Sequence, residues 1–344
     1  MVEQRADDQD DRELAADLTA LSGRRTKSAA AVLIDLGAST MTRSAFIGAD
    51  PERRFEIGSI TKGLTGMLLA DAIDRREVSL DTTIGDVLPR DARDQFGSIS
   101  FRELCTHTSG LPRMPRGASA LLRGDRFRLL GTPPYRGTTG LDILRAAARQ
   151  RLSGRGQFRY SNLGAAVLGQ LLALSVGADF GPLMTERIFA PLGMTGSAVT
   201  SPDRTAPPGW SSRGRQRQPW TNGGFAPAGG VFSTLGDMAR LAEALLDGSA
   251  PGIGSLAPIE GVAAGGPNQA IGMFWVVVSD PGTGRKIIWH NGQTGGYSSF
   301  MGLVPQSGRA TIVLANVSRL QGQERVAVGL AHHFVTPASS DPDD

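Results

Sequence analysis

Segments of strand length lie at the two ends of this sequence, and helical segments fill the long middle. Near the start, the apolar run Ala29 to Leu36 and the segment Ser44 to Ile47 have the length and composition of strands. Four more such segments follow residue 225, namely Ile271 to Val278, Lys286 to His290, Tyr297 to Val304 and Ala310 to Ala315. Strands at both ends with helices between them predict a discontinuous α/β domain, an inserted all-helical domain and a cleft where the two meet.

The same pattern sets the predicted boundaries of these parts. Residues 28–64 and 226–335 form the α/β domain and residues 65–225 the helical domain, with a frayed or loosely helical leader at 1–27 and a flexible tail at 336–344. Helices are expected at Thr61 to Ile73, Asp142 to Leu152, Leu163 to Val176, Phe180 to Phe189, Leu235 to Leu246 and about Gln323 to Phe334. A chain of 344 residues that is 40% apolar can bury a substantial core.

The first candidate for chemistry is the pair Ser59 and Lys62 in the segment FEIGSITKGLTG. The two residues stand three apart where a helix begins, so both side chains leave one face of its first turn. A lysine beside a serine lowers the cost of removing the hydroxyl proton, and a helix N-terminus offers backbone N–H groups to a developing oxyanion. Ser-x-x-Lys is common by chance, but only three of the 36 Lys and Arg residues are lysines, and a desolvated lysine can release a proton that arginine keeps.

Two later segments carry further candidates. Tyr160 and Asn162 stand in GRGQFRYSNLGAAVLGQLL, where a phenol beside an ammonium could accept the serine proton and an amide could orient a substrate carbonyl. His290, Gly292 and Gln293 stand in IIWHNGQTGGYSSF, where the glycine lets a strand lie close against a ligand and the next N–H could donate to an oxyanion. Alone, each segment is more often a helix-capping turn or a glycine-rich hairpin.

Together and in this order, the three segments resemble the three motifs of the penicillin-recognising serine hydrolase superfamily. Their Tyr-x-Asn and His-x-Gly forms are similar to the class C β-lactamase branch, which also holds esterases, D-amino-acid peptidases, carboxypeptidases and acyltransferases. LCTHTSGLP at 104–112, ERIFAPLGMT at 186–195 and APAGGVFSTLGDMARL at 226–241 also match, so the resemblance covers about residues 28–335. It implies an α/β (α+β) fold, in which an antiparallel sheet is flanked by helices and carries the inserted helical domain.

The resemblance also implies a role for each residue of the catalytic centre. Ser59 would attack the substrate carbonyl, Lys62 and Tyr160 would share its proton, and Asn162 would hold the acyl side chain. The backbone N–H groups of Ser59 and Gln293 would form the oxyanion hole.

Two departures from the family pattern bear on the substrate. His290 stands where the β-lactamases have lysine, so it would tune Tyr160 or touch the substrate. The missing ammonium for a substrate carboxylate favours neutral esters or amides over penicillins and cephalosporins. Substrate choice is expected in the arginine-rich loop between Leu111 and Asp142 and in Pro207 to Phe225, which holds Trp210 and Trp220.

Composition limits the other function classes. The net charge of +3 comes from scattered arginines that are densest at Arg113, Arg116, Arg123, Arg126 and Arg128, without a nucleic-acid motif, so we expect no nucleic-acid partner but allow a local attraction for anionic substrates. The single Cys105 excludes an internal disulfide and reads as a small buried residue. No apolar run approaches the roughly 18 residues of a membrane span. The acidic start Met1 to Asp11 lacks a signal-peptide pattern, which suggests the cytoplasm.

Other classes of hydrolase fit the sequence less well. A Ser-His-Asp hydrolase lacks its Gly-x-Ser-x-Gly elbow here, and a metal hydrolase lacks a His-x-x-x-His pair, since the histidines are His107, His290, His332 and His333. We therefore expect no metal and no cofactor, and a small ester, amide or β-lactam as substrate. Three functions stay open: a hydrolase working through an acyl-enzyme, an acyltransferase of secondary metabolism using the same intermediate, and a penicillin-binding module without turnover, which is the least favoured.

Overall fold

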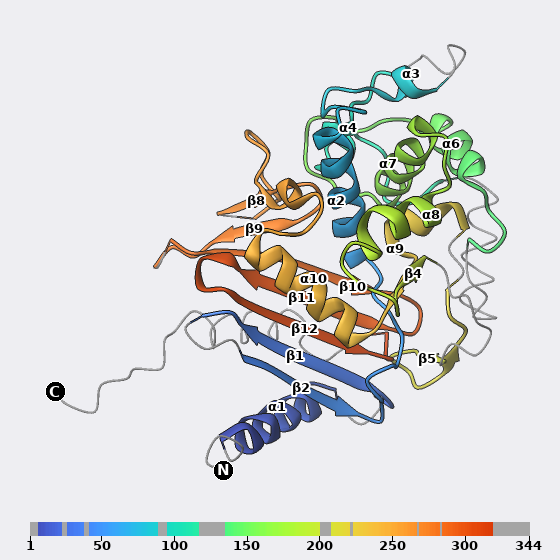
Figure 1. The fold of residues 1–344 in the computed structure, drawn as a ribbon. Helices are drawn as coiled ribbons and strands as arrows, with labels where there is room; N and C mark the ends of the chain where they lie inside the picture. The colour runs from blue at the N-terminus through green and yellow to red at the C-terminus, as the bar shows by residue number, and fades with distance from the viewer. Residues whose placement is uncertain are drawn as a thin grey trace.

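The structure of the protein is a computed structural model that describes residues 6–22, 26–37, 41–88, 95–116, 135–199, 208–220, 223–266, 268–282 and 284–318. The helix expected from about Gln323 to Phe334, the tail at 336–344, His332 and His333 lie outside these residues, as do Arg123, Arg126 and Arg128. The described elements form a large sheet with helices on both faces and a cluster of helices to one side of it (Figure 1).

Antiparallel pairing joins seven strands into the large sheet. Their order is β2 (Met41–Ile47), β1 (Ala29–Asp35), β12 (Arg309–Ala315), β11 (Ser298–Val304), β10 (Lys286–Gln293), β9 (Val276–Ser279) and β8 (Gln269–Ile271). Ala29 of β1 is paired with Ala315 of β12 on one side and with Ile47 of β2 on the other. Strands from the two ends of the chain therefore complete one sheet, and the fold class expected from the sequence is confirmed.

Both faces of the sheet are covered, which explains the continuous apolar run in β1. Side chains alternate between the faces of a strand. Val32 belongs to the main core, on the face where α10 (Leu235–Asp247) lies, whereas Ala31 belongs to a second cluster on the face that α1 (Ala6–Ser22) covers (Figure 1).

Helix α1 differs from the loose leader expected for residues 1–27. Leu14 and Leu18 are buried in the second cluster together with Phe300 and Val313 of the sheet. The two leucines are four residues apart, so they lie on one face of the helix and can pack against the strands together. The described part of this segment is therefore a packed layer. The division of the rest of the chain into two domains stays a prediction.

Helix α2 (Ile60–Asp74) connects the sheet to the helical cluster. It contacts β10 and β11 on one side and α7 and α9 on the other, and its residues from Ile60 to Ala72 are buried. Gly66 allows the close approach, because an added Cβ atom would lie 2.1 Å from the Met273 carbonyl oxygen. The predicted domain boundary at residues 64 and 65 falls inside this helix.

The helical cluster and the smaller sheets complete the described structure. The helices are α3 (Ile84–Val87), α4 (Phe101–Cys105), α6 (Gly140–Ala148), α7 (Asn162–Ser175), α8 (Phe180–Met184), the π-helical turn η2 (Thr185–Phe189) and α9 (Ala226–Gly229). The 3-10 turns are η3 (Gly223–Phe225), η4 (Ile253–Leu256) and η5 (Pro305–Ser307). One small sheet has the order β3 (Phe55–Glu56), β7 (Val231–Ser233), β4 (Ala198–Val199), and β5 (Gly209–Trp210) pairs with β6 (Gln216–Arg217).

One predicted strand is wrong. The segment Ile271 to Val278 forms the two strands β8 and β9, which are separated by a turn in which the Gly272 N–H donates to the Trp275 carbonyl. In this turn the buried indole of Trp275 packs directly on Gly63 of α2.

A helix that crosses a membrane must be both long and apolar. No single helix of the described part meets both requirements. The helix pair Asn162–Ser175 and Phe180–Phe189, bent by 86°, meets them by length and composition only.

Candidate active site

Ser59 lies at the N-terminal end of α2, in a turn that brings it next to β10. Gly58 before it has a φ of +52°, which favours glycine. A Cβ atom at Gly58 would also lie 2.7 Å from the backbone nitrogen of Gln293. The Ile57 N–H donates to the Val231 carbonyl (3.1 Å) and holds the start of this turn. The turn therefore brings the backbone next to Ser59 close to the backbone nitrogen of Gln293, and the N–H groups of these two residues are the ones expected to form the oxyanion hole.

Lys62 is completely buried one turn further along α2. Its Nζ donates to Ser59 Oγ (2.9 Å) and to the Ala228 carbonyl (2.6 Å), and it lies 5.0 Å from the centroid of the Tyr160 ring. Burial lowers the pKa of this amine, the interaction with Tyr160 raises it, and the positive charge of Arg113 lowers it further. A lysine held in this way has access to the neutral form that could accept the proton of Ser59.

Tyr160 and Asn162 reach the site from the start of α7. Ser161 caps the helix by accepting the Gly164 N–H (2.9 Å), so Asn162 is not the cap and its side chain is free for other contacts. The Asn162 Nδ2 atom donates to Met114 Sδ (3.3 Å). Tyr160 lies over His107, with ring centroids 4.6 Å apart.

His107 fixes the chain on both sides of Tyr160. Its Nδ1 accepts the Ser161 N–H (3.2 Å) and its carbonyl accepts the Arg159 N–H (2.8 Å). This histidine therefore has a structural hydrogen-bonding role. Cys105 nearby is buried, which raises the pKa of its thiol to about 12 and makes it a poor nucleophile.

Strand β10 forms the opposite wall and carries the third motif. Gly292 is needed for its packing, since an added Cβ atom would lie 2.0 Å from the Ile57 carbonyl oxygen and 2.3 Å from Ser299 Oγ. The close approach is thus to the turn before Ser59 and not directly to a ligand. The side chain of Gln293 turns away and donates to the Ser318 carbonyl, which leaves its backbone as the part next to Ser59.

His290 lies behind this wall. Its Nδ1 is 2.7 Å from the Asn291 carbonyl, and burial and the charge of Lys62 lower the pKa of the ring to about 3 against that hydrogen bond. The histidine is therefore neutral near neutral pH. It is not among the described residues that line the cavity, so the contact with substrate suggested for it has no support from the geometry.

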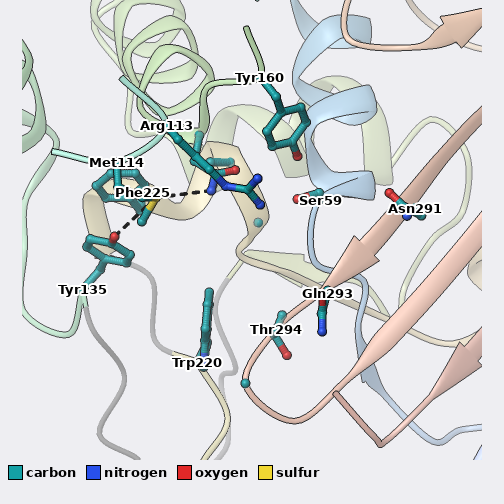
Figure 2. A pocket seen from close by; sticks show the side chains of 14 residues that line it. Ser59, Arg113, Met114, Tyr135, Tyr160, Trp220, Phe225, Asn291, Gln293 and Thr294 are labelled. Carbon is teal, nitrogen blue, oxygen red and sulfur yellow. Dashed lines mark hydrogen bonds between the residues drawn. The ribbon is translucent and has the colours of Figure 1, made fainter. Parts of the chain in front are cut away.

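A cavity of about 500 Å³ opens over Ser59 (Figure 2). Of the residues expected in the site, Ser59, Tyr160, Asn162 and Gln293 line it. The sequence did not predict Arg113, Met114, Tyr135, Phe225, Asn291 and Thr294 individually as lining residues, although the first four belong to the two segments expected to set substrate choice. Trp220 lines the cavity from the second expected loop, while Trp210 pairs in β5 and is not among the described lining residues.

The cavity has two chemically different sides. Met114, Tyr135 and Phe225 lie on one side and Asn291, Gln293 and Thr294 on the other, with Ser59 between them (Figure 2). The rings of Tyr135 and Phe225 are stacked, with centroids 3.9 Å apart. A substrate bound over Ser59 therefore meets an apolar wall and a polar strand.

Ser59 lies at a helix N-terminus, accepts a hydrogen bond from a buried amine and faces an open cavity. These features define a serine enzyme that can form a covalent acyl intermediate. The comparisons with known proteins agree with this class. The family described as Beta-lactamase matches residues 11–332. The D-alanyl-D-alanine-carboxypeptidase/endopeptidase AmpH of Escherichia coli K12 is 29% identical over 301 residues, which cover 80% of this chain and 74% of that protein.

Solved structures show the same fold. A class C β-lactamase from Rhodobacter sphaeroides superposes with a TM-score of 0.76 at 19% identity, covering 94% of this chain and 99% of the other. A D-stereospecific amidohydrolase from Streptomyces sp. superposes with a TM-score of 0.75 at 20% identity, covering 95% and 99%. The chain thus belongs to the Beta-lactamase family and is a serine hydrolase of the β-lactamase-like superfamily, as the motifs indicated.

Proposed function

We propose that this chain hydrolyses small esters or amides through an acyl-enzyme formed on Ser59. The observation that carries the proposal is the position of Lys62 Nζ, which lies buried between Ser59 Oγ at 2.9 Å and the Ala228 carbonyl at 2.6 Å. The relatives named as a carboxypeptidase/endopeptidase and as a D-stereospecific amidohydrolase support amides of D-amino acids as one substrate class to test.

The proposed reaction begins with Ser59. Neutral Lys62 accepts the hydroxyl proton while Oγ bonds to the substrate carbonyl carbon, and the backbone N–H groups of Ser59 and Gln293 stabilise the oxyanion. As the bond to the leaving group breaks, Lys62, directly or through Tyr160, returns the proton to the leaving oxygen or nitrogen. Water then attacks the acyl ester, and its proton passes through the same pair to Ser59, which restores the free enzyme.

Labelling and turnover test this proposal together. A fluorescent phosphonate that reacts with activated serines should label the wild type and not Ser59→Ala. The wild type should release product from at least one member of a panel of p-nitrophenyl esters, D-alanyl amides and nitrocefin. Equal labelling of Ser59→Ala would contradict the assignment of the nucleophile.

Product analysis separates hydrolysis from the two other functions. Amine or alcohol acceptors added to the assay should leave the free acid as the product, whereas an acylated acceptor would indicate an acyltransferase. A stable acyl adduct in the intact mass without product release would indicate a module that binds substrate but does not turn it over.

A further inference from the structure

Arg113 places a positive charge inside the cavity, on the wall opposite the third motif. The residue follows the turn that begins at His107, and its carbonyl accepts the N–H groups of Asn162 (3.1 Å) and Leu163 (3.2 Å). Its backbone is therefore fixed to the start of α7. The guanidinium carbon lies 5.3 Å from the centroid of the Tyr160 ring, and the side chain extends toward Ser59 (Figure 2).

The charge of Arg113 has no counterpart in the described part of the site. Among the described residues lining the cavity it is the only charged side chain, and no described carboxylate forms an ion pair with it. Other arginines are paired, as Arg155 is with Glu103 and Arg187 with Glu77. An arginine that is held over an aromatic ring and faces an open cavity is arranged to receive an anion.

The position of Arg113 indicates which part of a substrate would carry that anion. Arg113 and Asn162 lie on the same wall, because the Asn162 side chain donates to Met114, the residue after Arg113. The guanidinium lies between Ser59 and the apolar side chains Met114, Tyr135 and Phe225 (Figure 2). An acyl chain that leaves Ser59 toward that apolar side therefore passes the guanidinium.

We propose, on the basis of the function proposed above, that Arg113 selects substrates whose acyl group carries a carboxylate. The contact is a guanidinium–carboxylate pair, in which arginine can donate two parallel N–H bonds. His290 is neutral and lies behind the strand. The cation for an acidic substrate is therefore Arg113, on the loop held to the start of α7, and not a residue of the third motif. This modifies the expectation that the site prefers neutral esters or amides.

Two p-nitrophenyl esters with the same six-carbon acyl chain test the inference. The adipate monoester carries a terminal carboxylate and the hexanoate carries none. In the wild type, kcat/KM should be higher for the adipate monoester, and the adipate-to-hexanoate ratio should fall by about 10-fold to 100-fold in Arg113→Met. Added salt should reduce the ratio in the wild type more than in the variant, because salt screens the charge pair.

Arg116→Gln is the matched control, since this exposed arginine lies three residues further along the same loop and is not among the described lining residues. Its adipate-to-hexanoate ratio should equal that of the wild type. A ratio that is the same in the wild type and in Arg113→Met would overturn the inference, while Ser59-dependent turnover of hexanoate would still support the proposed hydrolysis.

A binding measurement tests the role of Arg113 without turnover. Titration calorimetry compares adipic acid monoamide, which carries one carboxylate, with hexanamide, which carries none. Ser59→Ala should bind the monoamide more tightly than hexanamide. This preference should disappear in the double variant that combines Ser59→Ala with Arg113→Met. Equal binding of the two ligands to Ser59→Ala would contradict the role of Arg113 even if no ester were hydrolysed.

Discussion

Lys62 is suited to accept a proton because of where the fold buries it. A charged amine removed from water costs free energy unless it is hydrogen-bonded, and Nζ donates to two oxygen atoms, Ser59 Oγ and the Ala228 carbonyl. Burial and the nearby Arg113 favour the neutral form, while Tyr160 favours the charged form. Arginine in the same place would stay charged and could not take the proton of Ser59.

This arrangement predicts unequal effects at three positions of the site. Lys62→Met and Tyr160→Phe should lower kcat/KM for a p-nitrophenyl ester by about 100-fold or more, because each removes a group that handles the proton. Gln293→Ala should change it by less than about 10-fold, since only the backbone of Gln293 lies beside Ser59 and its side chain bonds to Ser318.

Unfolding measurements separate catalysis from folding in this series. Lys62→Met fills nearly the same space without a buried amine, so its free energy of unfolding should not be lower than that of the wild type. Similar losses of kcat/KM in all three variants would contradict the roles assigned here.

Among the elements, β10 has a different environment in its two halves. Lys286 to Trp289 pair with β9 and Ile288 to Gln293 pair with β11, so His290 to Gln293 are paired in the ladder with β11 only. The second half therefore presents one side to the start of α2, and Gly292 determines how closely the two approach.

Gly292→Ala should damage both stability and catalysis. The added Cβ would meet the Ile57 carbonyl oxygen at 2.0 Å, so β10 has to move away from the turn that holds Ser59. We expect a loss of about 1 to 3 kcal/mol in the free energy of unfolding and a clear fall in kcat/KM. Gly254→Ala is the control, because nothing lies within 4 Å of its added Cβ. Matching denaturation curves for both variants would show that the close approach is unimportant.

Strand β3 contributes a buried carboxyl group beneath the cavity. Glu56 accepts the Trp220 N–H, and burial raises its pKa from 4.5 to about 7, although hydrogen bonds from Thr294 and Trp220 lower it. The folded protein thus holds a proton that the unfolded chain releases at lower pH. The stability from this proton is present below the unfolded pKa and is lost as pH rises through the folded value.

Glu56→Gln should remove this dependence. The free energy of unfolding of Glu56→Gln, relative to that of the wild type, should increase as pH rises from 4.5 to about 7, by at most about 3 kcal/mol. Urea denaturation of both proteins across this range measures the difference. If the free energy of unfolding depended on pH in the same way in both proteins, Glu56 would titrate alike in the folded and unfolded states.

The sequence predicted the features that depend on local pattern. Its predictions failed where contacts between residues distant in sequence determine the structure. The apolar runs and the three motifs located most strands and the residues around Ser59. The break between β8 and β9 depends on Trp275 reaching α2, which periodicity cannot show. Arg113 belongs to an arginine-rich run for which an attraction for anionic substrates was allowed, but the sequence does not distinguish it from its neighbours, and only the fold places it in the cavity. His290 belongs to the third motif, but the sequence alone does not show that it is buried behind the strand.

At the scale of the whole molecule, the sheet separates two layers with different tasks. The main core lies on the face of α2 and α10 and supports the cavity, whereas α1 closes a smaller cluster on the opposite face (Figure 1). A change in the smaller cluster reaches Ser59 only through the sheet, whose strands β1, β12 and β11 are paired on both sides. Stability and catalysis should therefore respond differently to changes in the two layers.

Leu18→Ala tests this separation, because Leu18 is 1% exposed in the cluster under α1. Loss of its side chain should lower the free energy of unfolding by about 2 to 4 kcal/mol through lost burial and an unfilled space. Leu174→Ala makes the same chemical change at a side chain that is 50% exposed on α7 and should cost much less. Both variants should keep the wild-type kcat/KM well below their unfolding temperatures. A large fall in kcat/KM for Leu18→Ala alone would show that α1 shapes the active site through the sheet.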